Sequence, residues 1–252
     1  MYIIRSLEDL HNHNRRKLSQ LASAMAKKYE VIYQMVAPEQ FKEAVEFFND
    51  HFLLDEPSLT GSSRGSNHIQ SDVDKMDQLV LDFLKCNLSW CAVDTSTGKI
   101  VGLSVSHSQL LGDPPDTPPT SDEYVERGFS RHFACVMAML DLMLDYKKIL
   151  TSYQVSKALD VFAVGVHTEY RNKGIAAELV RRTLDHAVKL GFTLAGVLCT
   201  STYTQKLFER QGFETLQKEY YASYVDASTK STALEKVNKI HQCAVSYVKK
   251  LC

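Results

Sequence analysis

The chain lacks the features that mark membrane proteins and nucleic-acid-binding proteins. No run approaches the roughly 18 apolar residues that a membrane-spanning helix needs, and residues 1–17 carry no continuous apolar signal core. Charge of one sign is not in excess, because 29 Lys and Arg residues face 30 Asp and Glu residues, for a net charge of −1. This balance argues against a nucleic-acid backbone or an anionic membrane as the main partner. We therefore expect a cytoplasmic protein that binds small molecules.

Paired cysteines are also missing. The six cysteines are scattered without C-x-x-C spacing, so neither a zinc site nor a disulfide framework is indicated, and we expect reduced thiols and no metal. The composition, with 44% hydrophobic and 23% charged residues, is that of an ordinary globular protein. Residues 1–30 are polar and helix-prone, which predicts a helical or partly disordered extension before a single compact domain at residues 31–252.

The apolar pattern predicts an α/β (α+β) fold. Residues 159–166, 175–190 and 193–199 read as a strand, a helix and a second strand, a succession that implies a parallel pair with a right-handed crossover. We expect the rest of the sheet to be mostly antiparallel, with helices on both faces. The other predicted strands are residues 31–36, 89–94, 99–109, 214–225 and 241–251, and the other predicted helices are residues 38–52, 73–88, 121–149 and 204–211.

Two connections stand out as candidate surface loops. The helix at residues 38–52 runs into Asp55-Glu56-Pro57, where the proline ends helical geometry and leaves two carboxylates at the exit. Residues 58–71 are rich in Gly and Ser and longer than a connector needs to be, which suggests a substrate loop. Residues 111–120 contain four prolines and predict a stiff surface loop. The Met and aromatic residues of 121–149 favour core packing.

Residues 160–176 carry the clearest ligand-binding pattern. An apolar strand and a short turn lead into Arg171-x-x-Gly174-x-Ala176, which opens a helix. A glycine at a helix start, with outward backbone amides and a neighbouring cation, is suited to holding a pyrophosphate. The pattern is neither the dinucleotide fingerprint, because G-x-G-x-x-G is absent, nor a P-loop, because no Gly-Lys-Ser/Thr follows.

This hexad resembles the R/Q-x-x-G-x-G/A acyl-CoA loop of the GCN5-related N-acetyltransferases. A second motif of that superfamily, F-E-x-x-G-F, stands at the family spacing as residues 208–213. Residues 52–57, residues 197–204 and the closing strand resemble the invertebrate arylalkylamine N-acetyltransferases, the type that acetylates dopamine and serotonin. The resemblance covers roughly residues 31–252.

The resemblance implies the fold of this superfamily, with the parallel strand pair splayed, acetyl-CoA as co-substrate, and an arylalkylamine of the dopamine, serotonin, tyramine or octopamine type as acceptor. It implies that the pyrophosphate lies on the loop and that the pantetheine arm runs along the preceding strand, where a backbone amide would polarise the acetyl carbonyl. The expected donor-binding residues are Val164, Gly165, Val166, Arg171, Asn172, Lys173, Gly174, Ile175 and Ala176.

The resemblance also implies catalytic residues. An alkylammonium must lose a proton before it attacks, and the family's base, the glutamate of Asp-Glu-Pro, maps onto Glu56. The family's two serines, proposed to assist proton handling, map onto Thr200 and Thr204, which keep a hydroxyl. Phe208 stands where the wider superfamily often has a general-acid tyrosine. Tyr203 or a nearby hydroxyl would then return a proton to CoA, unless the thiolate leaves unaided. The amine is expected to attack directly.

Two other functions stay open at this point. One is an acetyltransferase of the same superfamily for another amine, such as a polyamine or an amino acid derivative. The other is an acyl-CoA-binding module without turnover, which the two threonines and the missing tyrosine permit and which Glu56 opposes. Cys199 is expected to be a packed core thiol, and the tyrosines of the late strand (Tyr220, Tyr221 and Tyr224) fit an acceptor pocket or an ordinary strand equally well.

Overall fold

A computed structural model describes residues 30–60, 70–113, 117–232, 234, 237 and 240–252. The predicted N-terminal extension, apart from Glu30, lies outside the described residues, as do residues 61–69 of the predicted substrate loop. Among the residues described, no helix combines the length and the apolar character needed to cross a membrane.

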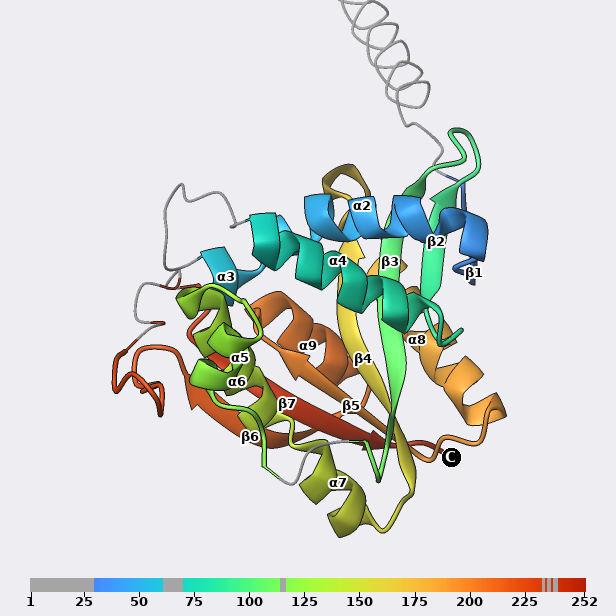
Figure 1. The fold of residues 1–252 in the computed structure, drawn as a ribbon. Helices are drawn as coiled ribbons and strands as arrows, with labels where there is room; N and C mark the ends of the chain where they lie inside the picture. Colours follow the sequence, from blue (N-terminus) through green and yellow to red (C-terminus); the bar gives the residue numbers. More distant parts are fainter. Residues whose placement is uncertain (1–29, 61–69, 114–116, 233, 235–236, 238–239) are drawn as a thin grey trace, which may run out of the picture.

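The described residues form a mixed sheet of seven strands in the order β1-β2-β3-β4-β5-β7-β6 (Figure 1). Every neighbouring pair is antiparallel except β4 and β5, which are parallel. This arrangement confirms the predicted fold class. The strands are β1 (Val31–Met35), β2 (Trp90–Asp94), β3 (Ile100–Leu110), β4 (Lys157–Val166), β5 (Leu194–Cys199), β6 (Glu214–Tyr220) and β7 (Cys243–Lys250).

The helices follow the predicted order, with two differences. The single helical stretch predicted at residues 121–149 is three helices, because Gly128 has a positive φ of 85° and Asp145 caps the start of a new helix. Residues 58–60 of the predicted loop are helical, and Ser58 is buried. The α-helices are α2 (Phe41–His51), α3 (Pro57–Thr60), α4 (Gln70–Leu84), α5 (Ser121–Glu126), α6 (Arg131–Met143), α7 (Tyr146–Tyr153), α8 (Ile175–Lys189) and α9 (Thr202–Arg210), and the 3-10 helices are η1 (Pro38–Gln40), η2 (Leu53–Asp55) and η3 (Thr168–Tyr170).

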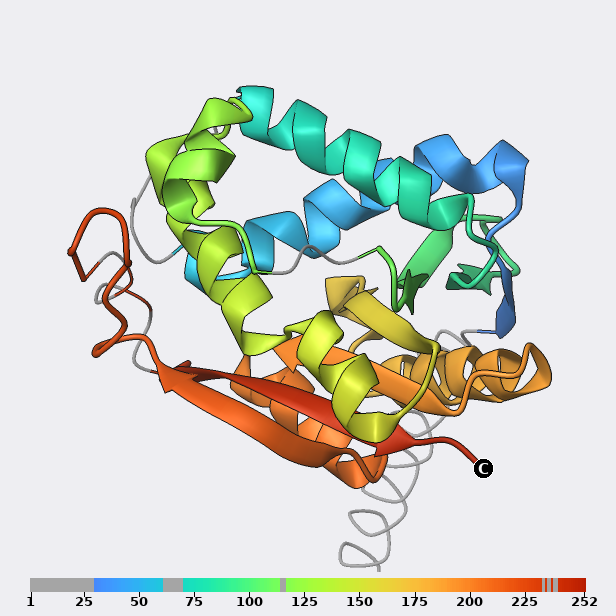
Figure 2. The ribbon, with the colours of Figure 1, turned by 60° about the horizontal axis from the view of Figure 1, so that its bottom comes forward.

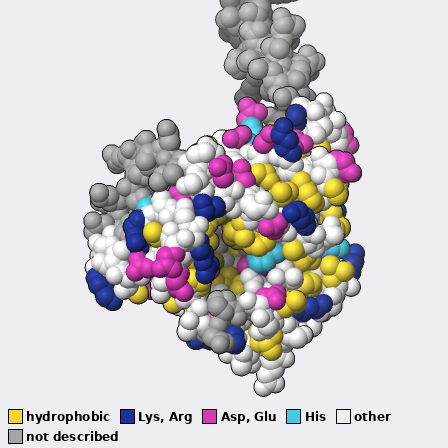
Figure 3. Space-filling model, viewed as in Figure 1, with side chains coloured by type: hydrophobic (Ala, Val, Ile, Leu, Met, Phe, Trp, Pro, Cys, Tyr) yellow, Lys and Arg dark blue, Asp and Glu magenta, His cyan; other side chains and the backbone are white. Residues whose placement is uncertain are grey.

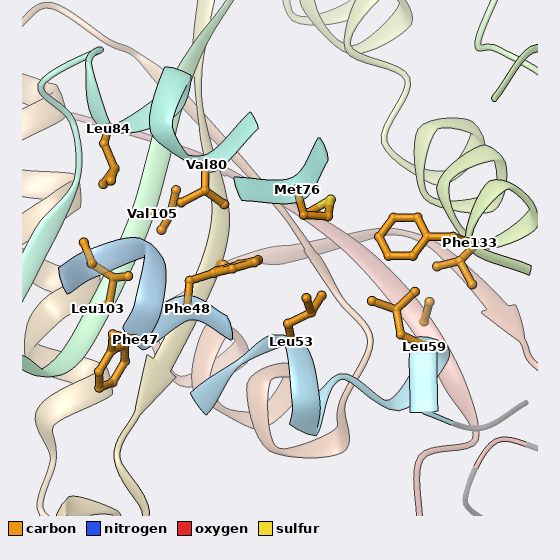
Figure 4. Close-up of a cluster of buried hydrophobic side chains, with 14 of the residues drawn as sticks. Phe47, Phe48, Leu53, Leu59, Met76, Val80, Leu84, Leu103, Val105 and Phe133 are labelled. Atoms are coloured by element: carbon orange, nitrogen blue, oxygen red, sulfur yellow. The ribbon is translucent and has the colours of Figure 1, made fainter. Parts of the chain in front are cut away.

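The helices cover both faces of the sheet (Figures 1 and 2). On one face, α2, α4 and α6 enclose the largest hydrophobic cluster, in which Phe48 and Val80 meet Val105 of β3 (Figure 4). On the other face, α8 and α9 pack against a second cluster that includes Leu159 and Val197 of the two parallel strands. The alternation of side chains along β3, β4 and β5 therefore decides which helix layer each residue meets.

The parallel pairing of β4 and β5 is short. Only Leu159↔Ala195 and Asp160↔Gly196 are in register. Immediately afterwards β4 carries a bulge against β3, because Val105 pairs with Ala163 while Ser106 pairs with Val161, which leaves Phe162 as the extra residue. A bulge bends its strand and increases its twist. From Val161 onward β4 consequently diverges from β5, as the resemblance implied.

Helix α8 lies close to β3 because residue 102 is a glycine. A Cβ added there would stand 2.9 Å from Ile175 Cγ2 and 3.1 Å from Leu179 Cδ1. Both distances are shorter than a normal carbon–carbon contact of about 3.5 Å. The absent side chain thus sets the position of the first turn of α8.

We expect Gly102→Ala to destabilise the protein by about 1–3 kcal/mol, because the added methyl group overpacks the contact between β3 and α8. Gly112→Ala is a matched control, since no atom lies within 4 Å of a Cβ added at that position. Urea unfolding of both variants measures the difference. Equal stabilities would show that α8 can shift without cost.

Candidate active site

A cavity of about 700 Å³ lies where β4 and β5 diverge. Its walls come from the second half of β4, the turn before α8, the end of β5 with the start of α9, and η2 with the residues that follow it. Of the nine expected donor-binding residues, eight line this cavity. Lys173 does not, because its Nζ donates to the carbonyl oxygen of Glu169 and lies over the Tyr170 ring.

The turn before α8 presents backbone amides to this cavity. Gly174 is the N-cap of α8 and has a positive φ of 79°, which glycine adopts without a steric penalty. The first turn of a helix leaves its amide groups without intrahelical partners and carries the positive end of the helix dipole. Tyr170 anchors the turn by donating a hydrogen bond to Asp94, and hydrogen bonds from Ser96 and Tyr170 lower the pKa of Asp94 to about 2. The turn is therefore held rigidly where an anionic ligand would meet amides.

Arg171 reaches across the mouth of the larger cavity. Its Nη2 lies 2.6 Å from Asp55 Oδ2, and its Nε donates to the carbonyl oxygen of Val166 at 3.0 Å. The ion pair joins the turn before α8 to Asp55, the residue before Glu56. Both side chains are well exposed to solvent, so the pair contributes little to stability by itself.

Glu56 is buried and lines both this cavity and a second one described below. Its Oε1 accepts hydrogen bonds from the Ser58 backbone amide at 3.1 Å and the Ser58 hydroxyl at 2.7 Å, and its Oε2 accepts one from Thr200 Oγ1 at 2.8 Å. Burial raises the pKa of Glu56 above the ordinary value, although the hydrogen bonds from Ser58 and Thr200 oppose the rise. A carboxylate in this setting is more basic than one in water.

The two threonines have different partners. Thr200 contacts Glu56, and its carbonyl oxygen accepts a hydrogen bond from Tyr221 at 2.7 Å. Thr204 Oγ1 instead lies 2.9 Å from both Oγ and O of Ser201, which caps the start of α9. Tyr203 lines the mouth of the larger cavity and is 70% exposed. Thr200 is thus the only one of these predicted residues with a hydrogen bond to Glu56 among the described contacts.

A second cavity of about 260 Å³ adjoins the first. It lies between α4, α6 and the face of β3 and β4, and a hollow with hydrophobic side chains and a histidine is visible on that face of the molecule (Figure 3). Both cavities share one wall, so a ligand in each would meet there. The residues that line both are Phe52, Glu56, Val161, Phe162, Leu198 and Thr200.

Sequence reasoning missed most of the smaller cavity. Its walls include Met76 and Phe83 of α4 and Phe133 and Met137 of α6, residues whose apolar pattern is the same as that of a core helix. Its polar lining residues were not singled out as site residues: they are His107, Gln109, Tyr124, Asp141, Tyr146 and Asp160.

The late tyrosines line neither cavity: Tyr221 and Tyr224 belong to the core, and Tyr220 is exposed. A metal site is not evident either, since no cluster of three or more potential ligands occurs in the described parts of the chain.

Comparison with known proteins relates this geometry to a family. Residues 124–213 match the model of the acetyltransferase (GNAT) family, so this part of the chain is similar to a GNAT acetyltransferase domain. The fold is shared with arylalkylamine N-acetyltransferase 2 from Aedes aegypti, at a TM-score of 0.77 and 20% identity over 88% of this chain and 100% of that one. A Drosophila melanogaster polyamine N-acetyltransferase, described as forming N-acetylagmatine, is similar at a TM-score of 0.74 and 19% identity over 88% and 100% of the two chains. A mosquito arylalkylamine N-acetyltransferase like 5b has a TM-score of 0.74 and 21% identity over the same shares.

Replacing Glu56 by glutamine should change how stability depends on pH. Because the folded pKa of Glu56 is raised, the folded chain binds this proton more tightly than the unfolded chain, and the stability this supplies is lost as pH rises through the folded pKa. Glu56→Gln removes the titration, so in urea unfolding the variant should gain stability relative to the parent as pH rises above the ordinary carboxyl pKa of 4.5. The exposed change Glu39→Gln is the control, and a constant difference for Glu56→Gln would contradict the raised pKa.

Proposed function

We propose that this chain transfers the acetyl group of acetyl-CoA to the primary amine of an arylalkylamine, with Glu56 as the general base. The observation that carries the proposal is the position of Glu56, a buried carboxylate in the wall shared by both cavities. The larger cavity would hold the donor and the smaller one the acceptor. The reacting amine would then lie beside a carboxylate whose pKa is raised by burial, which makes it a stronger base for general-base catalysis.

The larger cavity suits acetyl-CoA for two reasons. The amides at the start of α8 face it, which supports binding of the pyrophosphate there by residues 171–176. Beyond Asp160, β4 no longer pairs with β5, so the backbone of Val164, Gly165 and Val166 has an open side on which an extended pantetheine arm can pair as a strand does. One amide of this segment would donate to the acetyl carbonyl oxygen.

The reaction needs a neutral amine. Removing a proton from an alkylammonium with a pKa of about 10.4 costs about 4–5 kcal/mol at pH 7 in water. Glu56 would accept that proton, directly or through a water, and Thr200 would orient its carboxylate. The amine nitrogen then forms a bond to the acetyl carbon, the carbon–sulfur bond breaks, and the CoA thiolate leaves with the electron pair.

No covalent enzyme intermediate is part of this proposal. Cys199 lines the larger cavity, but burial raises the pKa of its thiol well above the ordinary value, so the reactive thiolate is disfavoured. Phe208 is buried and cannot donate a proton. Tyr203, which is exposed and lines this cavity, or a hydroxyl among Thr200, Ser201 and Thr204 would return a proton to the thiolate, unless the thiolate leaves unaided.

An aromatic acceptor fits the smaller cavity because phenylalanines form much of its wall, among them Phe52, Phe83, Phe133 and Phe162. Aromatic rings pack favourably against one another at centroid distances of about 4.5–7 Å. A polyamine is the second candidate acceptor, and the observation that favours it is the presence of Asp141 and Asp160 in the same cavity.

The proposed base is tested by Glu56→Gln. We expect kcat to fall by about 100-fold or more, since general-base catalysis contributes about that much, while the affinity for acetyl-CoA is kept. Thiol release from acetyl-CoA with a panel of amines measures the rate, and calorimetry measures the affinity. Tight acetyl-CoA binding without turnover of any amine by the parent chain would instead support a non-catalytic acyl-CoA-binding module.

The two threonines give a second test. Thr200→Val removes a hydrogen bond that lowers the pKa of Glu56, so the acidic limb of the kcat/KM profile should move to higher pH. Thr204→Val should move it less, because the hydroxyl of Thr204 contacts Ser201. Both profiles are recorded with one amine at saturating acetyl-CoA. Equal shifts would remove Thr200 from its proposed role.

A further inference from the structure

The polar residues of the smaller cavity gather around two carboxylates. Asp160 of β4 and His107 of β3 are register partners, and His107 Nε2 lies 3.2 Å from Asp160 Oδ2. The ring of His107 stacks on Phe83 of α4, with 3.7 Å between centroids. Asp141 of α6 accepts a hydrogen bond at its Oδ2 from the hydroxyl of Tyr124. Each carboxylate thus has its Oδ2 atom in contact with a neighbouring side chain.

Tyr146 supplies a second observation. Its side chain is 95% buried and lines the same cavity, and its hydroxyl makes no hydrogen bond of normal geometry with a described residue, although the nearby carboxylate of Asp160 adds to the rise that burial causes in its pKa. The hydroxyl lies over Gly196, where an added Cβ would stand 2.5 Å from it. The fold makes room for this group although no described residue makes a hydrogen bond of normal geometry to it.

Among the described residues, the carboxylates of the smaller cavity also have no Lys or Arg side chain beside them in its lining. Burial raises the pKa of Asp141 to about 6, with the nearby Asp160 adding to the rise and with Tyr124 and Arg127 opposing it. Asp141 and Asp160 line the cavity together with Glu56, and the described residues place no Lys or Arg side chain in its lining. A ligand group that donates hydrogen bonds would satisfy the carboxylates and the hydroxyl of Tyr146 together.

The separation from Glu56 sets the length of such a ligand. Tyr146 lies over Gly196 of β5, whereas Glu56 is bound to Thr200, four residues further along the chain. Four extended residues span about 13 Å. With a hydrogen bond of about 2.9 Å at each end, the two polar groups of the ligand would be about 7 Å apart.

We propose that Asp141, Asp160 and Tyr146 form a subsite that binds a second hydrogen-bond donor of the acceptor, at the end remote from the reacting amine. The inference rests on the proposed function, because it assigns the smaller cavity to the acceptor. The donor is a ring hydroxyl or a second ammonium group, and in both cases the carboxylates accept its hydrogen bond. Acceptors without such a group should be poor substrates, so this subsite sets specificity.

Matched pairs of amines test the subsite and identify the donor. Tyramine is compared with phenethylamine, and 1,5-diaminopentane with pentylamine, by thiol release from acetyl-CoA with the full chain at pH 7.5. A hydrogen bond to a charged group is worth about 10- to 100-fold, so kcat/KM should be higher by that factor for the first member of one pair. The pair that shows the factor tells whether a hydroxyl or an ammonium is bound.

Two variants locate the effect. Asp141→Asn should reduce the ratio within that pair to about threefold or less, and Tyr146→Phe should reduce it several-fold. Tyr146→Phe keeps the packing of the ring and removes only the hydroxyl, and a purely structural role would not change the ratio. Asp82→Asn, on the exposed face of α4, is the control that should keep both the rate and the ratio.

The outcomes separate this inference from the proposed function. If the amines turn over but both pairs give ratios near one, the subsite is refuted and the acetyltransferase remains. If no amine turns over, the proposed function fails, and calorimetric binding of the same pairs to the chain with CoA then decides the subsite. Ratios that survive in Asp141→Asn and Tyr146→Phe would also refute it.

Discussion

The structure depends on how briefly β4 and β5 pair. Two residue pairs, Leu159↔Ala195 and Asp160↔Gly196, hold the two strands together, and the bulge at Phe162 then turns β4 away. A parallel sheet that stayed closed would use the backbone groups of Val164 to Val166 for its own hydrogen bonds. Because the pairing ends early, those groups face the larger cavity, and the turn before α8 is carried to its mouth.

The same divergence places the catalytic candidates on segments that are distant in sequence. Glu56 and Thr200 are 144 residues apart and are joined by one partly buried hydrogen bond. The exposed ion pair between Arg171 and Asp55 links the turn before α8 to the segment that carries Glu56, but solvent screens this pair. The orientation of Glu56 therefore depends on its contacts with Ser58 and Thr200, which solvent does not weaken.

The sequence predicted structural features that neighbouring residues determine. It did not predict the cavity lining that segments far apart in the sequence form together. The strand, turn and helix around Gly174 follow from neighbouring residues, and so does the exit of the helix before Glu56. The smaller cavity is different, because Phe83, Phe133 and Asp160 come from three elements whose meeting is decided by packing. An apolar helix face beside a cavity has the same periodicity as one in a filled core, and residues 121–149 were assigned to the core for that reason. The late tyrosines fitted a pocket or an ordinary strand equally well in the sequence, and Tyr221 supports Thr200 from within the core.

Three groups in the smaller cavity destabilise the folded protein when no ligand is bound. Burial disfavours the ionised forms of Glu56 and Asp141, and the hydroxyl of Tyr146 makes no hydrogen bond of normal geometry with a described residue. In a core that serves only to fold, each would be replaced at a gain by an apolar residue of similar size. Their shared property is that all three line one cavity, on opposite sides of the space that β5 spans between Gly196 and Thr200. Unfavourable groups that gather around one space, with apolar walls between them, are explained together by a ligand that carries a polar group at each end.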